Sequence, residues 1–167
     1  YSRKWTEECT TCQQMKVHRH THSSMTPLSP PSARFERVHL DIVGPLPVCP
    51  NHSGNHAKAR YLVTVVDAFT RWIEAIPVEN ISAEEVAGAF VSGWISRFGV
   101  PTQVVTDRGS QFESQFFQQI TSIFGFVRCR TTAYHPQANG AIERQHRQLK
   151  KILRCHGDDW LRSLPIA

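Results

Sequence analysis

The sequence predicts an α/β domain in which helices flank a mixed five-stranded sheet. Three apolar runs of the kind that form strands follow one another in the first half of the chain, separated by turn residues. Two further strand-like runs then alternate with segments of helical periodicity. With 167 residues, the chain is long enough for one ordinary core and an arm of about thirty residues.

The five expected strands are short and are bounded by glycine, proline or polar residues. Gly44-Pro45-Leu46-Pro47 stops the first strand, and the polar, glycine-containing segment after it predicts a loop. The short connection between the second and third strands favours antiparallel pairing, and Asp67 is interpreted as a cap of the turn toward Thr70. The strands are expected at residues 35–43, 60–69, 72–78, 103–106 and 126–130.

Three helices are expected, and the first opens with a capping box at Ser82-Ala-Glu-Glu85. In this motif the Ser82 hydroxyl accepts a hydrogen bond from the Glu85 amide while the Glu85 carboxylate reaches back. This helix ends near residue 99, the second spans residues 113–124, and the third begins near residue 139. The apolar face of the first helix, which we assign to the core, holds Val86, Phe90, Gly93 and Trp94.

Three acidic residues stand in contexts that together predict a metal site. Asp41 interrupts the first strand, Asp107 closes the fourth, and Glu143 opens the last helix, with thirty-five residues between the last two acids. A carboxylate inside a strand must be paired or hold a cation, because leaving it buried alone costs several kcal/mol. Three neighbouring carboxylates repel one another unless a divalent cation neutralises them, and oxygen ligands suit Mg²⁺ or Mn²⁺. Taken singly, each acid also fits a solvated surface group or a cap.

The last helix combines an apolar stripe with a charged stripe beside it. The apolar stripe is expected to pack on the sheet, and the charged stripe to present one carboxylate among three cations. Residues 126–154 hold seven Lys and Arg against one acid, in a chain of formal charge +5, which favours contact with DNA phosphates. A solvated helix face is the alternative for the charges alone. The apolar stripe is Ile142, His146, Leu149 and Leu153, and the charged stripe is Glu143, Arg147, Lys150 and Arg154.

The segment before this helix contains Pro136, Asn139 and Gly140 and predicts a loop at the rim of the site. Its side chains are candidates for contact with DNA bases or sugars, although an ordinary surface loop explains them equally well. The candidate DNA contacts of loop and helix together are Tyr134, Gln137, Asn139, Arg144, Arg147, Lys150, Lys151 and Arg154.

The five cysteines do not suggest a disulfide framework, because their number is odd. Cys9-Thr-Thr-Cys12 is a candidate zinc half-site, since two thiolates at this spacing can bind one Zn²⁺. Three histidines follow it and are interpreted by default as part of a polar arm, with zinc ligation as the alternative. These histidines are His18, His20 and His22, and the other thiols, Cys49, Cys129 and Cys155, have no metal-ligand spacing.

Several motifs occur in a specific order along the chain. They are Asp41-Ile-Val-Gly-Pro-Leu-Pro47, Thr106-Asp-Arg-Gly-Ser-Gln-Phe112, Thr132-Ala-Tyr-His-Pro-Gln-Ala-Asn-Gly140, Glu143-Arg144 and Leu149-Lys150. Together they resemble the integrase catalytic core of gypsy-type LTR retrotransposons and their retroviral relatives, from about Cys9 to the end of the chain. The resemblance implies a ribonuclease-H-like fold, a triad of Asp41, Asp107 and Glu143, two Mg²⁺ (or Mn²⁺) ions, and DNA 3′-end processing and strand transfer.

The resemblance also implies how the chain is organised. Residues 1–22 match the remnant of an N-terminal zinc-binding domain, of which Cys9 and Cys12 are the second half. Residues 23–34, rich in proline and serine, match a linker, and residues 35–167 match a catalytic core without its last helices. The start at Tyr1 rather than Met suggests a piece of a longer polyprotein or a truncated reading frame. The expected partners are LTR ends, target DNA and further copies of the protein, in the nucleus and in the cytoplasmic particle of the element.

Two other functions fit parts of the sequence. A DNA-binding remnant or host-adopted derivative would keep the basic helix without turnover, although all three acids and the loop are intact. A ribonuclease H would share the fold and the metals, but it would not explain the loop and the linker. No membrane partner is expected, since no apolar run approaches the ~18 residues that a membrane span needs.

Overall fold

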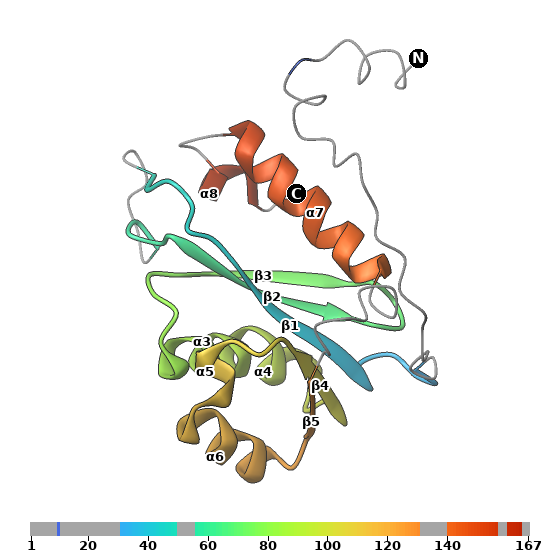
Figure 1. The fold of residues 1–167 in the computed structure, drawn as a ribbon. Coiled ribbons are helices and arrows are strands. Elements are labelled where there is room, and N and C mark those ends of the chain that lie inside the picture. Colours follow the sequence, from blue (N-terminus) through green and yellow to red (C-terminus); the bar gives the residue numbers. More distant parts are fainter. Residues whose placement is uncertain (1–9, 11–30, 50–55, 131–139, 157–159, 165–167) are drawn as a thin grey trace.

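The computed structural model describes residue 10 and residues 31–49, 56–130, 140–156 and 160–164, and a five-stranded sheet lies at its centre (Figure 1). The strand order is β3-β2-β1-β4-β5. Both antiparallel and parallel pairs occur, so the prediction of a mixed five-stranded sheet is confirmed. The strands are β1 (Arg37–Val43), β2 (Tyr61–Asp67), β3 (Ile73–Val78), β4 (Gln103–Thr106) and β5 (Val127–Arg130).

The central strand β1 sets the registers of the sheet. It pairs antiparallel with β2 and parallel with β4, where Leu40 lies opposite Thr106. The pair β2 and β3 is antiparallel, as the short connection between them predicts, and β4 and β5 are parallel. Gly44 follows β1 with a φ of 150°, and a Cβ there would lie 2.4 Å from the Tyr61 ring. Only glycine fits this close approach, which is where the strand ends.

Helices cover both faces of the sheet, as the sequence predicts. In Figure 1 the long helix α7 and the short α8 lie on one side, and the helices between β3 and β5 lie on the other. Alternate residues of a strand point to opposite faces, so each strand contributes to both layers. The first layer is α7 (Gly140–His156) and α8 (Trp160–Ser163), and the second is α3 (Ala83–Phe90), the π-helical turn η1 (Val91–Ile95), α4 (Ser96–Phe98), α5 (Ser110–Glu113) and α6 (Gln115–Phe124).

Each layer buries its own apolar core against the sheet. On the α3 side, Val86, Phe90 and Trp94 are fully buried, which confirms their assignment to the core. On the α7 side, Leu149 and Leu153 pack with residues of β1 and β2. The apolar stripe of the last helix therefore packs on the sheet as predicted, except that the side chain of Ile142 lies outside the described residues.

The capping box at the start of α3 is only half correct. Ser82 Oγ accepts a hydrogen bond from the Glu85 amide at 3.3 Å, as expected. The Glu85 carboxylate instead accepts from the amides of Glu79 at 2.7 Å and Asn80 at 3.2 Å. The Ser82 amide donates to Asn80 Oδ1 at 2.9 Å, so the turn before the helix already satisfies the group that Glu85 was expected to cap.

Two element boundaries differ from the prediction for a clear backbone reason. The helix expected at 113–124 begins at Gln115 as α6, after the separate short helix α5, because Ser114 is extended (φ −65°, ψ 152°) and accepts at Oγ from the Phe117 amide as the N-cap of α6. The first strand begins at Arg37, because Phe35 has a φ of 64° and so cannot continue it. The remaining strand ends move by one or two residues.

Asp67 caps the turn between β2 and β3, which confirms its predicted role. Its buried carboxylate accepts from the Thr70 amide at 2.8 Å and the Thr70 hydroxyl at 2.6 Å. The other oxygen accepts from the Phe35 amide at 2.9 Å. Phe35 and Arg71, at φ 64° and 70°, are held in the left-handed region beside these bonds. Asp67 thus fixes two strained segments at one end of the sheet.

We expect Asp67→Asn to lower the free energy of unfolding by about 1–3 kcal/mol, measured by urea denaturation. The amide nitrogen that replaces one oxygen would face a donor, and that buried donor would lose its partner. Glu84→Gln is the matched control, because Glu84 is exposed on α3, and it should change stability by less than about 0.5 kcal/mol. Parent stability in Asp67→Asn would contradict the capping role.

Candidate active site

Asp41 on β1 and Asp107 directly after β4 follow the last paired residues of these two parallel strands. The last pair of the β1–β4 ladder is Leu40 opposite Thr106, so each acid is the next residue on its own chain segment. Neighbouring strands lie about 4.8 Å apart, and the two backbones are therefore side by side at this level. The structure thus brings together the first two acids that the sequence singles out.

Asp41 is held from two directions. Its Oδ1 accepts from the Ile42 amide at 2.8 Å, and its Oδ2 lies 3.1 Å from His146 Nδ1 on α7. Burial raises the pKa of this carboxyl, but the hydrogen bond and charge of His146, the Ile42 amide and the charge of Lys150 together outweigh it. The pKa of Asp41 therefore lies below its ordinary value, and the group is an anion at neutral pH.

His146 is the site residue that sequence reasoning missed. The helical periodicity placed it among apolar residues and predicted only packing, and it is indeed buried. Its second ring nitrogen, Nε2, lies 3.1 Å from Thr64 Oγ1, and the same hydroxyl lies 3.1 Å from the Asp41 carbonyl oxygen. A polar residue in an apolar stripe, three positions after Glu143, was the signal in the sequence. His146 and Thr64 together fix α7 to β1 and β2 at Asp41.

Glu143 lies in the first turn of α7, three residues before His146. One helical turn rises about 5.4 Å, so its backbone is less than a turn away from the residue that contacts Asp41. The side chain of Glu143 is outside the described residues, and its part in a triad stays a prediction. Among the side chains that the structure does describe, no group of three metal-binding residues is found.

His39 lies two residues before Asp41 on β1 and is almost completely buried. Burial and the nearby charges of Arg37, His146 and Arg71 lower the pKa of His39 to about 4. The ring is therefore neutral at neutral pH. The charges that lower the pKa of Asp41 come from α7, at His146 and Lys150, and not from this strand neighbour.

Asp107 stands in a different environment from Asp41. It is exposed, immediately after β4, and its Oδ1 accepts from the Gly109 amide at 2.9 Å. Because this bond lies within its own loop, the direction of the carboxylate follows the backbone of residues 107–109. Helix α5 begins directly afterwards at Ser110.

The basic residues of α7 are unequally exposed. Arg144 and Arg147 are exposed, whereas Lys150 and Lys151 are partly buried.

Several predicted site residues lie outside the described residues, so their roles stay predictions. These are Tyr134, Gln137 and Asn139 of the loop, the side chain of Arg154, and the zinc candidates Cys9, Cys12, His18, His20 and His22.

Comparison with known proteins places this site in a family. The model of the integrase core domain matches residues 31–136, which include both strand acids. The chain belongs to this family. The family is the one that the sequence motifs predict. No helix in the described part of this integrase core domain is long and apolar enough to cross a bilayer.

Similar sequences come from retrotransposons, as the motifs predict. The chain is 32% identical over 156 residues to the retrovirus-related Pol polyprotein from transposon 412 of Drosophila melanogaster, covering 93% of the chain and 12% of the polyprotein. It is 29% identical over 170 residues to the transposon Tf2-3 polyprotein of Schizosaccharomyces pombe, covering 98% of the chain and 12% of that protein. The chain thus spans a small part of these curated relatives.

Solved retroviral integrases share the fold. The catalytic core domain of BIV integrase matches with a TM-score of 0.56 and 21% identity, covering 73% of this chain and 71% of that one. A simian T-cell lymphotropic virus intasome in complex with PP2A regulatory subunit B56 gamma matches with a TM-score of 0.63 and 19% identity, covering 93% and 52%. The ribonuclease-H-like fold is therefore confirmed.

We expect His146→Ala to raise the pKa of Asp41 in the metal-free protein, measured by carboxyl-carbon NMR titration. Burial raises the pKa of Asp41, and without the imidazole fewer interactions lower it. In the parent, the lowered pKa of Asp41 stabilises the folded protein at pH values above the pKa that Asp41 has in the unfolded chain. This contribution is lost as the pH falls through the pKa of Asp41 in the folded protein. His146→Ala should therefore lose less stability than the parent as the pH falls from 5 to 3.

His56→Ala is the control for this titration, because His56 is an exposed histidine outside α7. It should leave unchanged both the pKa of Asp41 and the loss of stability as the pH falls from 5 to 3. A pKa of Asp41 that is the same in His146→Ala and the parent would contradict the contact.

Proposed function

We propose that this integrase core domain processes and joins DNA 3′ ends, with Asp41, Asp107 and Glu143 as ligands of two divalent cations. The observation that carries the proposal is the β1–β4 register, which sets Asp41 beside Asp107. The contact of His146 with Asp41, 3.1 Å long, supports the third role, since Glu143 lies in the helical turn before His146.

The donor set fits Mg²⁺ or Mn²⁺. The carboxylates of Asp41 and Asp107 would repel each other at close range, and a cation that both of them held would remove that cost. Oxygen-only ligands select hard cations of this kind over zinc or copper. When bound, a pair of such ions supplies an activated water or hydroxyl and stabilises the leaving oxygen of a phosphodiester. The HTLV-2 integrase catalytic core, a fold relative with a TM-score of 0.54 and 21% identity, is described in complex with magnesium.

The residues of the chain itself would hold the acids and the DNA. His146 and Thr64 keep Asp41 in one orientation, so that the ionised carboxylate is ready before a cation arrives. Arg144 and Arg147 expose two guanidinium groups on the same helix as Glu143. A phosphate backbone that runs along this face of α7 would be neutralised there while its reacting group lies at the acids.

The proposal also covers the DNA substrates, the oligomeric state and the location of the protein. The DNA substrates would be LTR ends and target DNA, and the active form would be a homo-oligomer that acts in the nucleus after assembly in a cytoplasmic particle. Two structural relatives are described as a trimeric form and an intasome, which supports assembly. Residues 1–22, with Cys9 and Cys12, would complete a zinc domain with residues further upstream in the polyprotein.

We expect Glu143→Gln to lower the rate of strand transfer of labelled LTR-end DNA in the presence of Mg²⁺ by about a hundredfold or more. The amide keeps the size and helix propensity of the side chain but removes the charge needed to hold a cation. The assay uses a polypeptide that extends this chain at both ends, with Glu84→Gln as a matched control on the opposite face of the sheet.

The same assay separates the competing functions. Joining by the parent and by Glu84→Gln, lost in Glu143→Gln, supports the integrase. Cleavage of an RNA–DNA hybrid without DNA joining would indicate a ribonuclease H. DNA binding without any metal-dependent nicking in the parent would indicate a DNA-binding remnant. Parent-level joining by Glu143→Gln would defeat the triad.

We also expect Arg147→Gln to weaken DNA binding and to reduce the slope of log affinity against log salt concentration by about one unit. The reason is the loss of one phosphate contact on the exposed face of α7. Arg97→Gln is the control, because Arg97 is also exposed but lies on α4, in the opposite layer. Equal slopes for the two variants would assign Arg147 to a solvated helix face.

A further inference from the structure

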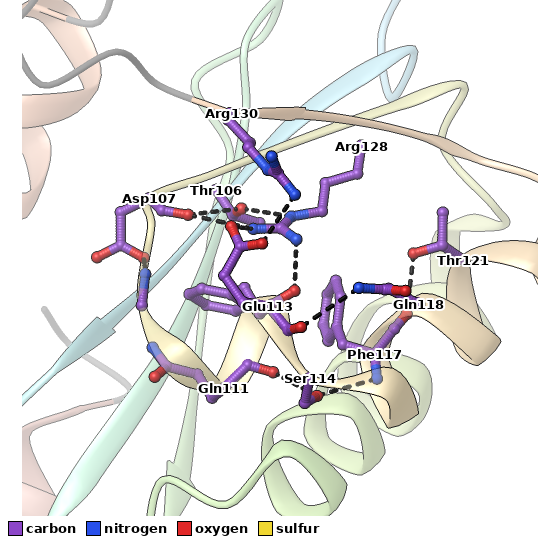
Figure 2. Close-up of polar contacts among 12 residues, drawn as sticks. Thr106, Asp107, Gln111, Glu113, Ser114, Phe117, Gln118, Thr121, Arg128 and Arg130 are labelled. Atoms are coloured by element: carbon purple, nitrogen blue, oxygen red, sulfur yellow. Dashed lines mark hydrogen bonds and ion pairs between the residues drawn. The ribbon is translucent and has the colours of Figure 1, made fainter.

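A largely buried arginine, Arg128 of β5, lies at the junction of β4 and α5 (Figure 2). Its side chain is only 9% exposed. The guanidinium donates from Nε to Thr106 Oγ1 at 3.0 Å and from Nη1 to the Phe112 carbonyl. Nη2 donates to Glu113 Oε1 at 2.8 Å and, at 3.4 Å, to the Asp107 carbonyl oxygen. One side chain therefore binds four groups on two elements.

These four groups lie at the two ends of the loop that carries Asp107. Thr106 and Asp107 close β4, and Phe112 and Glu113 belong to α5, so the segment between them is tied at both ends to one guanidinium. Thr106 Oγ1 also donates to the Asp107 carbonyl oxygen at 3.0 Å, which adds a second bond at the strand end. The loop backbone thus has little freedom to move relative to β4.

The planar shape of the arginine matters for this arrangement. A guanidinium presents several donors in fixed directions, whereas a lysine ammonium is one point charge that cannot bind four spread acceptors at once. Glu113 supplies the counter-charge for the buried cation and binds exposed Arg130 with its other oxygen at 2.8 Å. The hydrogen bond from Arg128 is the largest cause that lowers the pKa of Glu113. The pair is therefore charged at neutral pH.

The direction of the Asp107 carboxylate depends on this loop. Asp107 is exposed, and its Oδ1 accepts from the Gly109 amide within the loop itself. Asp41, by contrast, is oriented by His146 from another element. Asp107 thus takes its orientation from the backbone that Arg128 holds.

We propose that Arg128, with Glu113 as its counter-ion, is the positioning residue that orients Asp107 for cation binding. The inference rests on the proposed function for the role of Asp107 as a ligand, and it adds two residues that act without touching the cation. Partners of this kind typically change metal affinity by about 10–100-fold when removed.

The test compares Arg128→Lys with the parent and with Arg130→Met. Arg130 binds the same Glu113 but is exposed, so it is a matched control. The first measurement is hydrogen exchange of the Gly109 amide in metal-free protein, with the Val65 amide of buried β2 as an internal reference. The second is Mn²⁺ affinity by calorimetry, with Asp107→Asn as the reference for a lost ligand.

Arg128→Lys should speed exchange at Gly109 by about tenfold relative to Val65 and weaken Mn²⁺ binding by about tenfold. Arg130→Met should change neither by more than about twofold. Parent-level exchange at Gly109 in Arg128→Lys overturns the proposal, and so does an equal rise at Gly109 and Val65, which would mean a general loss of stability.

Two further outcomes keep the tests separate. If Asp107→Asn binds Mn²⁺ as the parent does, the proposed metal site fails, while exchange at Gly109 still decides whether Arg128 orients the loop. If Arg128→Lys does not fold, Glu113→Gln replaces it, because Glu113 is partly exposed and the amide keeps an acceptor. That variant should speed exchange at Gly109 by about threefold, since it weakens a charge-assisted bond, and no change would overturn the proposal.

Discussion

The parallel register of β1 and β4 is the constraint on which the site depends. It brings Asp41 and Asp107 to the same level on adjacent strands, where two negative charges are unfavourable unless something offsets them. Lys150 and His146 partly do so for Asp41. The proposed metal site would use these two carboxylates as oxygen ligands, a donor type that suits a divalent cation.

The two acids are supported in different ways. Asp41 lies within a strand and is held by α7 through His146, so its position depends on how the helix packs on the sheet. Asp107 follows a strand, is exposed, and depends on a loop tied down by a buried arginine from β5. A change in helix packing and a change at the sheet edge would therefore disturb different halves of the site.

The two faces of the sheet also differ in the contacts that they make. The α3 side is a core of aromatic and aliphatic residues, with Phe35, Phe90 and Trp94 among its rings. The α7 side is also apolar at Leu149 and Leu153, but it changes to polar contacts at His146 and Thr64. One helix thus provides both apolar packing on the sheet and the contact with Asp41.

The sequence by itself determined the strands, the packing faces of α3 and α7 and the positions of the three acids along the chain. Hydrophobic period and turn residues are local, so they are readable without coordinates. The contact of His146 with Asp41 and the four bonds of Arg128 were decided only by tertiary structure. They join residues that are far apart in the sequence, such as Asp41 and His146, and no local pattern encodes the parallel pairing of β1 with β4.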